Sequence, residues 1–189
     1  MTPFEYILPL VSVLVGLAVA DLAISLHRML RARRRVRWDA LPLATAVLAV
    51  LAVLELWWNF YAQQDGGFYT TLGGFLLFAT QLLILFLLNA AALPDIVPDD
   101  GLDLRVFYDT NGPYFWSLYA AYVLFIMVTS VIGALGGDLG DVLRRIAGNS
   151  PLLILFAALA RFRNRIFHTL AVTAVLALFL FEWSKLSLG

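Results

Sequence analysis

Four polar residues interrupt long apolar stretches of the sequence, and they are the residues best suited to chemistry: Asp21, Glu55, Gln81 and His168. An ionisable group in apolar surroundings is costly, and it is therefore a functional candidate by default. Carboxylates in such surroundings can act as transient binding sites for a proton or a small cation. The sequence therefore points first to proton or cation handling, provided that the segments around these side chains bring them together.

The composition indicates that lipid, and not water, surrounds most of the chain. Apolar residues make up 62% of the 189 residues and charged residues 14%, whereas soluble proteins have roughly 45–50% and about 25%. A soluble domain of this size cannot hide so many apolar side chains, because its surface needs polar groups. The formal net charge of zero gives no reason to expect nucleic acid. The absence of cysteine excludes disulfides, thiolate metal sites and cysteine nucleophiles.

Apolar runs of the right length predict six transmembrane helices in a single all-α domain over residues 1–189. A helix needs about 20 residues to cross roughly 30 Å of hydrocarbon. Five segments reach that length, and a sixth, which begins at Pro151 with Ser150 as its N-cap, is shorter. The predicted helices cover residues 4–26, 40–62, 68–93, 114–135, 151–163 and 164–184.

The segment before the fifth helix predicts a short amphipathic helix at the membrane surface. Residues 138–148 carry Arg144 and Arg145 beside an apolar face made of Leu139, Val142, Leu143 and Ile146. A helix with this pattern lies along the interface and does not cross the bilayer.

The first apolar run is predicted to be a transmembrane helix and not a cleaved signal peptide. Ala18-Val19-Ala20 resembles a cleavage site, but residues 1–6 contain Glu5 and no Lys or Arg. A signal peptide begins with positive charge, so this run lacks an essential feature of one.

Positive charge predicts the orientation in the membrane. If the short fifth helix crosses, only Arg144, Arg145 and Lys185 lie on the same side as the two termini. The positive-inside rule then makes the other side cytoplasmic, so we expect a bacterial inner membrane protein with both termini on the periplasmic side. The predicted cytoplasmic side holds Arg28, Arg31, Arg33, Arg34, Arg35, Arg37, Arg105, Arg161, Arg163 and Arg165.

Several short patches resemble an uncharacterised group of bacterial six-helix integral membrane proteins. The patches are FEYILPLVSVLVGLAVADL, LHRMLRARRRVRWDALPL, LELWWNF, LNAAALPD and LDLRVFYDTNGPYFW. The most specific part is the Arg-rich turn that ends at Trp38, followed by a helix with Trp57-Trp58. The resemblance implies the six-helix fold, and it assigns no functional residue.

The depths of the polar residues predict a ladder through the bundle. Counted at about 1.5 Å per residue from the helix midpoints, Glu55 lies roughly 6 Å to the outer side, while Asp21 and His168 lie roughly 9 Å to the inner side. Gln81 lies close to the midplane, and Asn59 extends the stripe of Glu55 by one helical turn. Such a ladder favours an oligomeric channel- or carrier-like conduit for protons or a small ion.

The same polar residues also have a structural interpretation. Helices in lipid hydrogen-bond to one another without any ion moving, and Asp21 can pair with Arg28 on its own helix. Glu55 has no cationic partner in its own helix, which favours the conduit. The alternative is a non-catalytic accessory or scaffold subunit of a larger membrane complex. Small residues such as Gly16 and Ala20, four apart, fit either internal packing or a homo-oligomer.

The remaining polar residues predict no cofactor, no metal site and no catalysis. His27 lies about 9 Å nearer the cytoplasm than His168, so the two cannot share a haem. The spacing of the carboxylates in residues 95–109 does not match a calcium loop, and pairing with the Arg-rich turn is the favoured explanation.

No phosphate-binding glycine loop, HExxH or nucleophile elbow occurs. Asp21 and Glu55 are about 15 Å apart along the membrane normal, too far to share a proton.

The Arg-rich turn itself has two interpretations. It sets the topology, and it can contact the anionic head groups of membrane lipids. Its basic residues are Arg31, Arg33, Arg34, Arg35 and Arg37.

Overall fold

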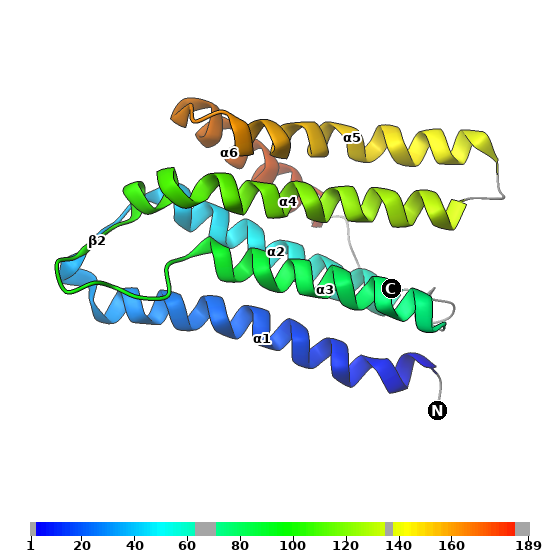
Figure 1. Cartoon of the computed structure of the whole chain (residues 1–189), viewed down its shortest axis with the longest axis horizontal. Helices are drawn as coiled ribbons and strands as arrows, with labels where there is room; N and C mark the ends of the chain where they lie inside the picture. Colours follow the sequence, from blue (N-terminus) through cyan, green and yellow to red (C-terminus); the bar gives the residue numbers. More distant parts are fainter. Residues whose placement is uncertain (1–2, 63–70, 135–137, 184–189) are drawn as a thin grey trace.

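The computed structural model describes residues 3–62, 71–134 and 138–183, and these residues form an antiparallel bundle of helices (Figure 1). Each of six helices is long and apolar enough to cross a membrane. The helices are α1 (Pro3–Arg31), α2 (Ala40–Ala62), α3 (Leu72–Ala92), α4 (Leu104–Ala134), α5 (Leu139–Arg161) and α6 (Arg165–Trp183). Between them lie a 3₁₀ turn, η1 (Arg33–Arg35), and two short strands, β1 (Val36–Arg37) and β2 (Leu102–Asp103).

The predicted all-α class is confirmed, and uninterrupted apolar runs gave the best helix boundaries. Helix α2 covers the predicted residues 40–62, and α6 differs from its prediction by little. Helix α3 begins at Leu72 because the Thr71 hydroxyl accepts a hydrogen bond from the Gly74 N–H at 3.1 Å and caps the helix. Residues 68–70, 135 and 184 of the predicted ranges lie outside the described residues.

The predicted starts and ends of two helices are wrong. Helix α1 continues past residue 26 to Arg31. Helix α4 begins at Leu104 and not at residue 114, because the Asp103 carboxylate caps its first turn by accepting from the N–H groups of Arg105 and Val106. Pro113 lies inside α4 without ending it.

The prediction of a separate interfacial helix before a short fifth helix is also wrong. Helix α5 runs without a break from Leu139 to Arg161, with Pro151 inside it, and it lies alongside α4 (Figure 1). The Asn149 amide donates to the Arg145 carbonyl at 2.9 Å, and the Ser150 hydroxyl donates to the Ile146 carbonyl at 2.6 Å. Residues 139–148 are therefore the first half of a full-length helix.

Helices α3 and α4 lie at the centre of the packing, and each contacts three other helices. Helix α3 packs against α1, α2 and α4, while α6 packs mainly against α2 and α5 packs mainly against α4. Helices α5 and α6 meet over only a short stretch, so α6 is held mainly by α2.

The loops at one end of the bundle pair with each other. We call residues 32–39 and 93–103 the paired loops; β1 and β2 run parallel within them, with Val36 opposite Leu102. The Arg35 and Arg37 guanidiniums contact the carboxylates of Asp99 and Asp103 at 3.0 and 3.4 Å. The predicted pairing of the acidic loop with the Arg-rich turn is therefore confirmed.

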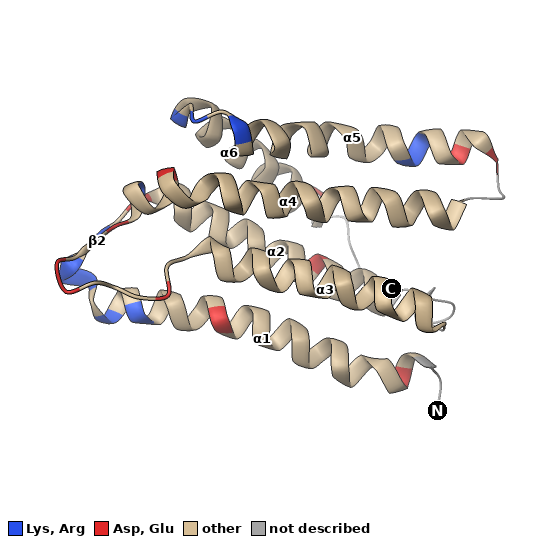
Figure 2. Ribbon diagram, in the orientation of Figure 1, with Lys and Arg blue, Asp and Glu red and all other residues tan. Residues whose placement is uncertain are grey.

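The basic residues gather at the end of the bundle that carries the paired loops (Figure 2). The loop between α5 and α6 joins them there, since the Arg165 guanidinium forms an ion pair with the Asp39 carboxylate. The Asp39 carboxylate also accepts from the Leu41 N–H at 2.9 Å and so caps α2. One end of the bundle is thus both basic and tightly cross-linked.

Candidate functional site

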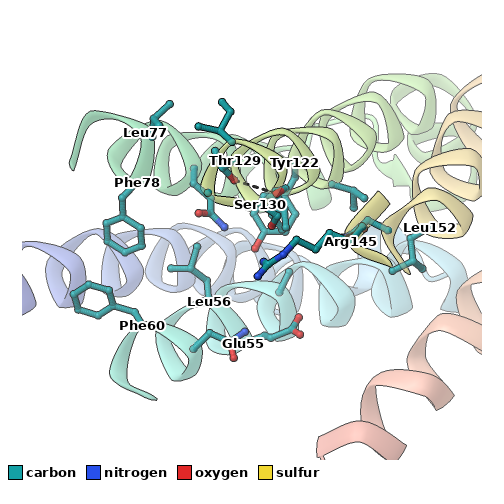
Figure 3. A pocket seen from close by; sticks show the side chains of 18 of the residues that line it. Glu55, Leu56, Phe60, Leu77, Phe78, Tyr122, Thr129, Ser130, Arg145 and Leu152 are labelled. Carbon is teal, nitrogen blue, oxygen red and sulfur yellow. Dashed lines mark hydrogen bonds between the residues drawn. The ribbon is translucent and has the colours of Figure 1, made fainter. Parts of the chain in front are cut away.

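A cavity of about 650 Å³ lies between the helices (Figure 3). Its lining residues come from the half of the bundle away from the paired loops. It is lined by α2, α3, α4 and α5, and Phe179 of α6 also contacts it. Its volume is within the range of roughly 300–1,000 Å³ that small-molecule sites occupy. We call it the polar cavity because its lining includes Glu55, Asn59, Thr71, Gln81, Tyr122, Thr129, Ser130, Arg145 and Asn149.

Helix α2 contributes Glu55 and Asn59 to the polar cavity, one helical turn apart on the same face. Ala52 and Leu56, which flank Glu55 on that face, are 1% and 5% exposed. Within the described ranges, Glu55 makes no hydrogen bond or ion pair. A half-buried carboxylate without a partner is therefore presented to the interior of the cavity (Figure 3).

Helices α3 and α4 contribute uncharged polar groups. Gln81 on α3 and Tyr122 on α4 both line the cavity. The Thr129 hydroxyl donates within its own helix, to the carbonyls of Phe125 and Ile126 at 2.9 and 3.0 Å. These groups give the wall a fixed shape, and they retain lone pairs for a ligand or for water.

Helix α5 contributes a cation, Arg145. Its neighbour Arg144 pairs with Asp141 at 3.4 Å and is not among the residues that line the cavity. Arg145 instead lines the cavity, and its side chain extends into it (Figure 3). It makes no ion pair with any of the residues that the structure describes. The polar cavity thus holds one carboxylate and one guanidinium on different walls, and they do not pair with each other.

An aromatic layer closes the polar cavity on the side of the paired loops. It consists of Trp116, Tyr119 and Phe156, which are at most 2% exposed. The Phe156 ring centroid lies 5.5 Å from that of Trp116 and 4.4 Å from that of Tyr119. The Tyr119 hydroxyl also donates to the Leu48 carbonyl at 3.2 Å, which ties the layer to α2.

His168 lies beyond the aromatic layer, in a hydrogen-bonded network of its own. Its Nε2 is 2.7 Å from the Phe162 carbonyl, which can only accept, so Nε2 carries the hydrogen. Its Nδ1 therefore accepts from the Tyr108 hydroxyl at 2.7 Å, and the Tyr108 oxygen accepts from the Trp116 indole N–H at 2.9 Å. Both ring nitrogens are occupied, and the residue is 6% exposed.

Asp21 lies on α1, which contributes no residue to the polar cavity. The pairing with Arg28 that the sequence permitted is not formed, since Arg28 donates instead to the Asp95 carbonyl at 2.8 Å. The structure therefore brings Glu55, Asn59 and Gln81 together and leaves Asp21 and His168 elsewhere. Of the basic turn, Arg31, Arg33 and Arg34 are exposed, and they make no ion pair within the part of the chain that the structure describes.

Arg145 is the site residue that sequence reasoning missed. The sequence placed it on an interfacial helix, because Ser150 and Pro151 looked like the start of the next one. The only signal in the sequence was a pair of adjacent arginines, and adjacent residues on a helix point in different directions. Nothing in the sequence says which of the two turns inward.

Comparisons of the chain with protein-family models, curated proteins and solved structures give no match. The resemblance to a group of bacterial six-helix membrane proteins therefore stays a prediction. The fold defines a coarser class: a helical bundle with six candidate membrane spans and a polar cavity in one half.

Proposed function

We propose that the chain is a carrier-like conduit of the bacterial inner membrane, and that the polar cavity is the outward-facing half of its path. Glu55 is the group that binds a proton or a small cation, with Asn59 and Gln81 beside it. The observation that carries the proposal is a carboxylate that lines a polar cavity within an otherwise apolar bundle and has no partner among residues 3–62, 71–134 and 138–183. Ionisable groups at membrane depth are costly and mark ion or substrate paths.

The aromatic layer favours a carrier over an open channel. A channel needs a continuous polar lining from one side to the other. Here the aromatic layer fills the bundle on the side of the cavity that faces the paired loops. A carrier opens to one side at a time. The layer is then the closed inner barrier of an outward-open state.

The distribution of positive charge supports the proposed orientation. The basic end, with the paired loops, faces the cytoplasm by the positive-inside rule, and the polar cavity lies in the opposite half. Both termini are then periplasmic, and the exposed Arg31, Arg33 and Arg34 lie at the level of anionic head groups.

Flux into liposomes tests the proposal. Protein reconstituted into sealed vesicles should collapse an imposed gradient of protons or alkali cations, read with an internal pH dye or a cation dye. Glu55→Gln should slow the flux at least about tenfold, since the neutral amide has no charge for a cation. Asp21→Asn, the matched change of a carboxylate outside the cavity, should leave it unchanged. Vesicles with wild-type protein that behave like empty vesicles would overturn the proposal.

The inner half of the bundle favours a second candidate, an accessory or scaffold subunit. There the polar atoms of the His168, Tyr108 and Trp116 side chains all have hydrogen-bond partners, as a purely structural role requires. The two candidates predict different assemblies. A conduit is extracted from its own lipids as a homo-oligomer, whereas a subunit is extracted with a different chain, and native mass spectrometry separates the two.

A further inference from the structure

We propose that the polar cavity binds an organic zwitterion, with its cationic amine at Glu55 and its anionic group at Arg145. This inference rests on the proposed function in taking the same cavity as the binding site, and it adds the class of substrate. It follows from three features of the cavity: two opposite charges that do not pair, a volume much larger than an ion, and a lining that is partly apolar.

The two charges are placed for a ligand and not for each other. Glu55 on α2 and Arg145 on α5 both line the cavity, and no ion pair joins them within 4.0 Å. Arg144, one residue away, does pair, with Asp141. An opposite charge within reach of each group would stabilise its charged form. One molecule that carries both charges satisfies both groups at once, which neither a simple cation nor a simple anion can do.

The cavity also has room for much more than a bare ion. A volume of about 650 Å³ accommodates a small organic molecule. The same lining includes Gln81, Tyr122 and Asn149, whose side chains offer hydrogen-bond donors and acceptors. Apolar side chains complete the wall, among them Leu56, Leu77, Ile126 and Leu152. The ligand is therefore a zwitterion with an apolar part.

Two sources supply this chemistry. A free amino acid with an apolar side chain carries an ammonium and a carboxylate. The head group of phosphatidylethanolamine carries an ammonium and a phosphate, with acyl chains attached. Recognition by Glu55 and Arg145 is the same in both cases, because the guanidinium donates hydrogen bonds to the oxygens of a carboxylate or of a phosphate.

Binding to wild-type protein in mild detergent tests the inference without any substituted residue. The probes are leucine, leucinamide, which lacks the anionic group, and N-acetylleucine, which lacks the cationic group. A parallel set uses dihexanoyl phosphatidylethanolamine and dihexanoyl phosphatidylglycerol. Isothermal titration calorimetry and the thermal unfolding temperature report binding. We expect one of the two zwitterions to bind about tenfold or more tightly than its singly charged analogues, because each charge-assisted contact is worth at least that factor.

Matched variants then assign the binding to the cavity. Glu55→Gln and Arg145→Gln should each weaken binding of the zwitterion about tenfold or more. Asp21→Asn and Arg144→Gln change the same residue types outside the cavity, and they should not weaken it. Failure of both zwitterions to bind wild-type protein, or binding that Glu55→Gln and Arg145→Gln leave unchanged, overturns the inference.

The two assays separate this inference from the proposed function. If the zwitterion binds through both charges but no flux of protons or cations is seen in vesicles, the ligand class holds and the conduit for protons or cations is overturned. If protons or cations pass through Glu55 but neither zwitterion binds, the conduit holds and the substrate class is overturned. Binding of leucine alone assigns the free solute, and binding of the lipid alone assigns the head group.

Discussion

Replacing His168 with Phe removes the acceptor of the Tyr108 hydroxyl and the donor to the Phe162 carbonyl. Two buried polar groups then lose their partners. Hydrogen bonds between membrane helices are worth about 0.6 kcal/mol on average and at most about 1.7, so two bonds predict a loss of about 1–3 kcal/mol in the free energy of unfolding. Tyr108→Phe also removes two bonds, those to His168 and from Trp116, and it should cost a similar amount.

The two substitutions share one hydrogen bond, so their effects should not add. The double variant should cost less than the sum of the single variants by about 0.6–1.7 kcal/mol, the worth of the Tyr108–His168 bond. Equilibrium unfolding in mixed micelles with a rising fraction of dodecyl sulfate measures each value. His27→Phe is the matched control, because His27 is exposed, and it should change stability by less than about 0.5 kcal/mol.

The reasoning is refuted if His168→Phe leaves the unfolding free energy within about 0.5 kcal/mol of the wild type, or if the two variants add. If His168→Phe instead lowers the flux and leaves the unfolding free energy unchanged, His168 belongs to the ion path, as the sequence predicted.

Two further predictions concern the paired loops and the aromatic layer. Gly101 has a φ of 107°, and a Cβ there would lie 3.0 Å from the Arg35 carbonyl oxygen, so Gly101→Ala should lower the unfolding free energy by about 1–3 kcal/mol. In the same assay, Gly112→Ala, whose Cβ meets Tyr108 only at 3.9 Å, should be neutral or stabilising; an equal loss for both would contradict this explanation. Phe156→Ala should open the aromatic layer and raise cation leak through reconstituted protein, whereas Ile154→Ala, on the exposed face of α5, should not; a folded Phe156→Ala protein with unchanged leak would show that the layer is not the barrier.

The sequence predicted helices well where apolar runs are uninterrupted and poorly where a proline or polar residues intervene. Helix α2 follows from an apolar run that has a proline only in its first turn, at Pro42, and no Gly or charge until Glu55. Pro151 was expected at the first position of a helix, since Pro favours the first turn, and Pro113 was expected just before a helix that begins at residue 114. Both instead lie inside longer helices, where packing of residues such as Leu104 and Phe156 outweighs the missing N–H.

Part of the candidate site could be predicted from the spacing of residues on one helix. Predicting the rest requires knowing how several helices pack together. Glu55 and Asn59 share a face because they are four residues apart, and Gln81 was placed at membrane depth too, close to the midplane. Asp21 met the same criterion of depth, but depth does not say which helices surround a cavity. Tyr108 and Trp116 could not be assigned to His168, because one sequence carries no information on which distant residues meet. Arg145 was missed because the helix boundary before it was wrong.

The central claim is that the polar cavity opens to the outer side of the membrane while the arginine-rich turn faces the cytoplasm. The chain has no cysteine, so single-cysteine variants can be labelled without any background from the protein. In intact cells, a membrane-impermeant maleimide should label Asn59→Cys and should reach Arg33→Cys only after permeabilisation. Labelling of Arg33→Cys from outside, or an Asn59→Cys thiol that stays unreactive from outside while a permeant maleimide modifies it, would contradict the account.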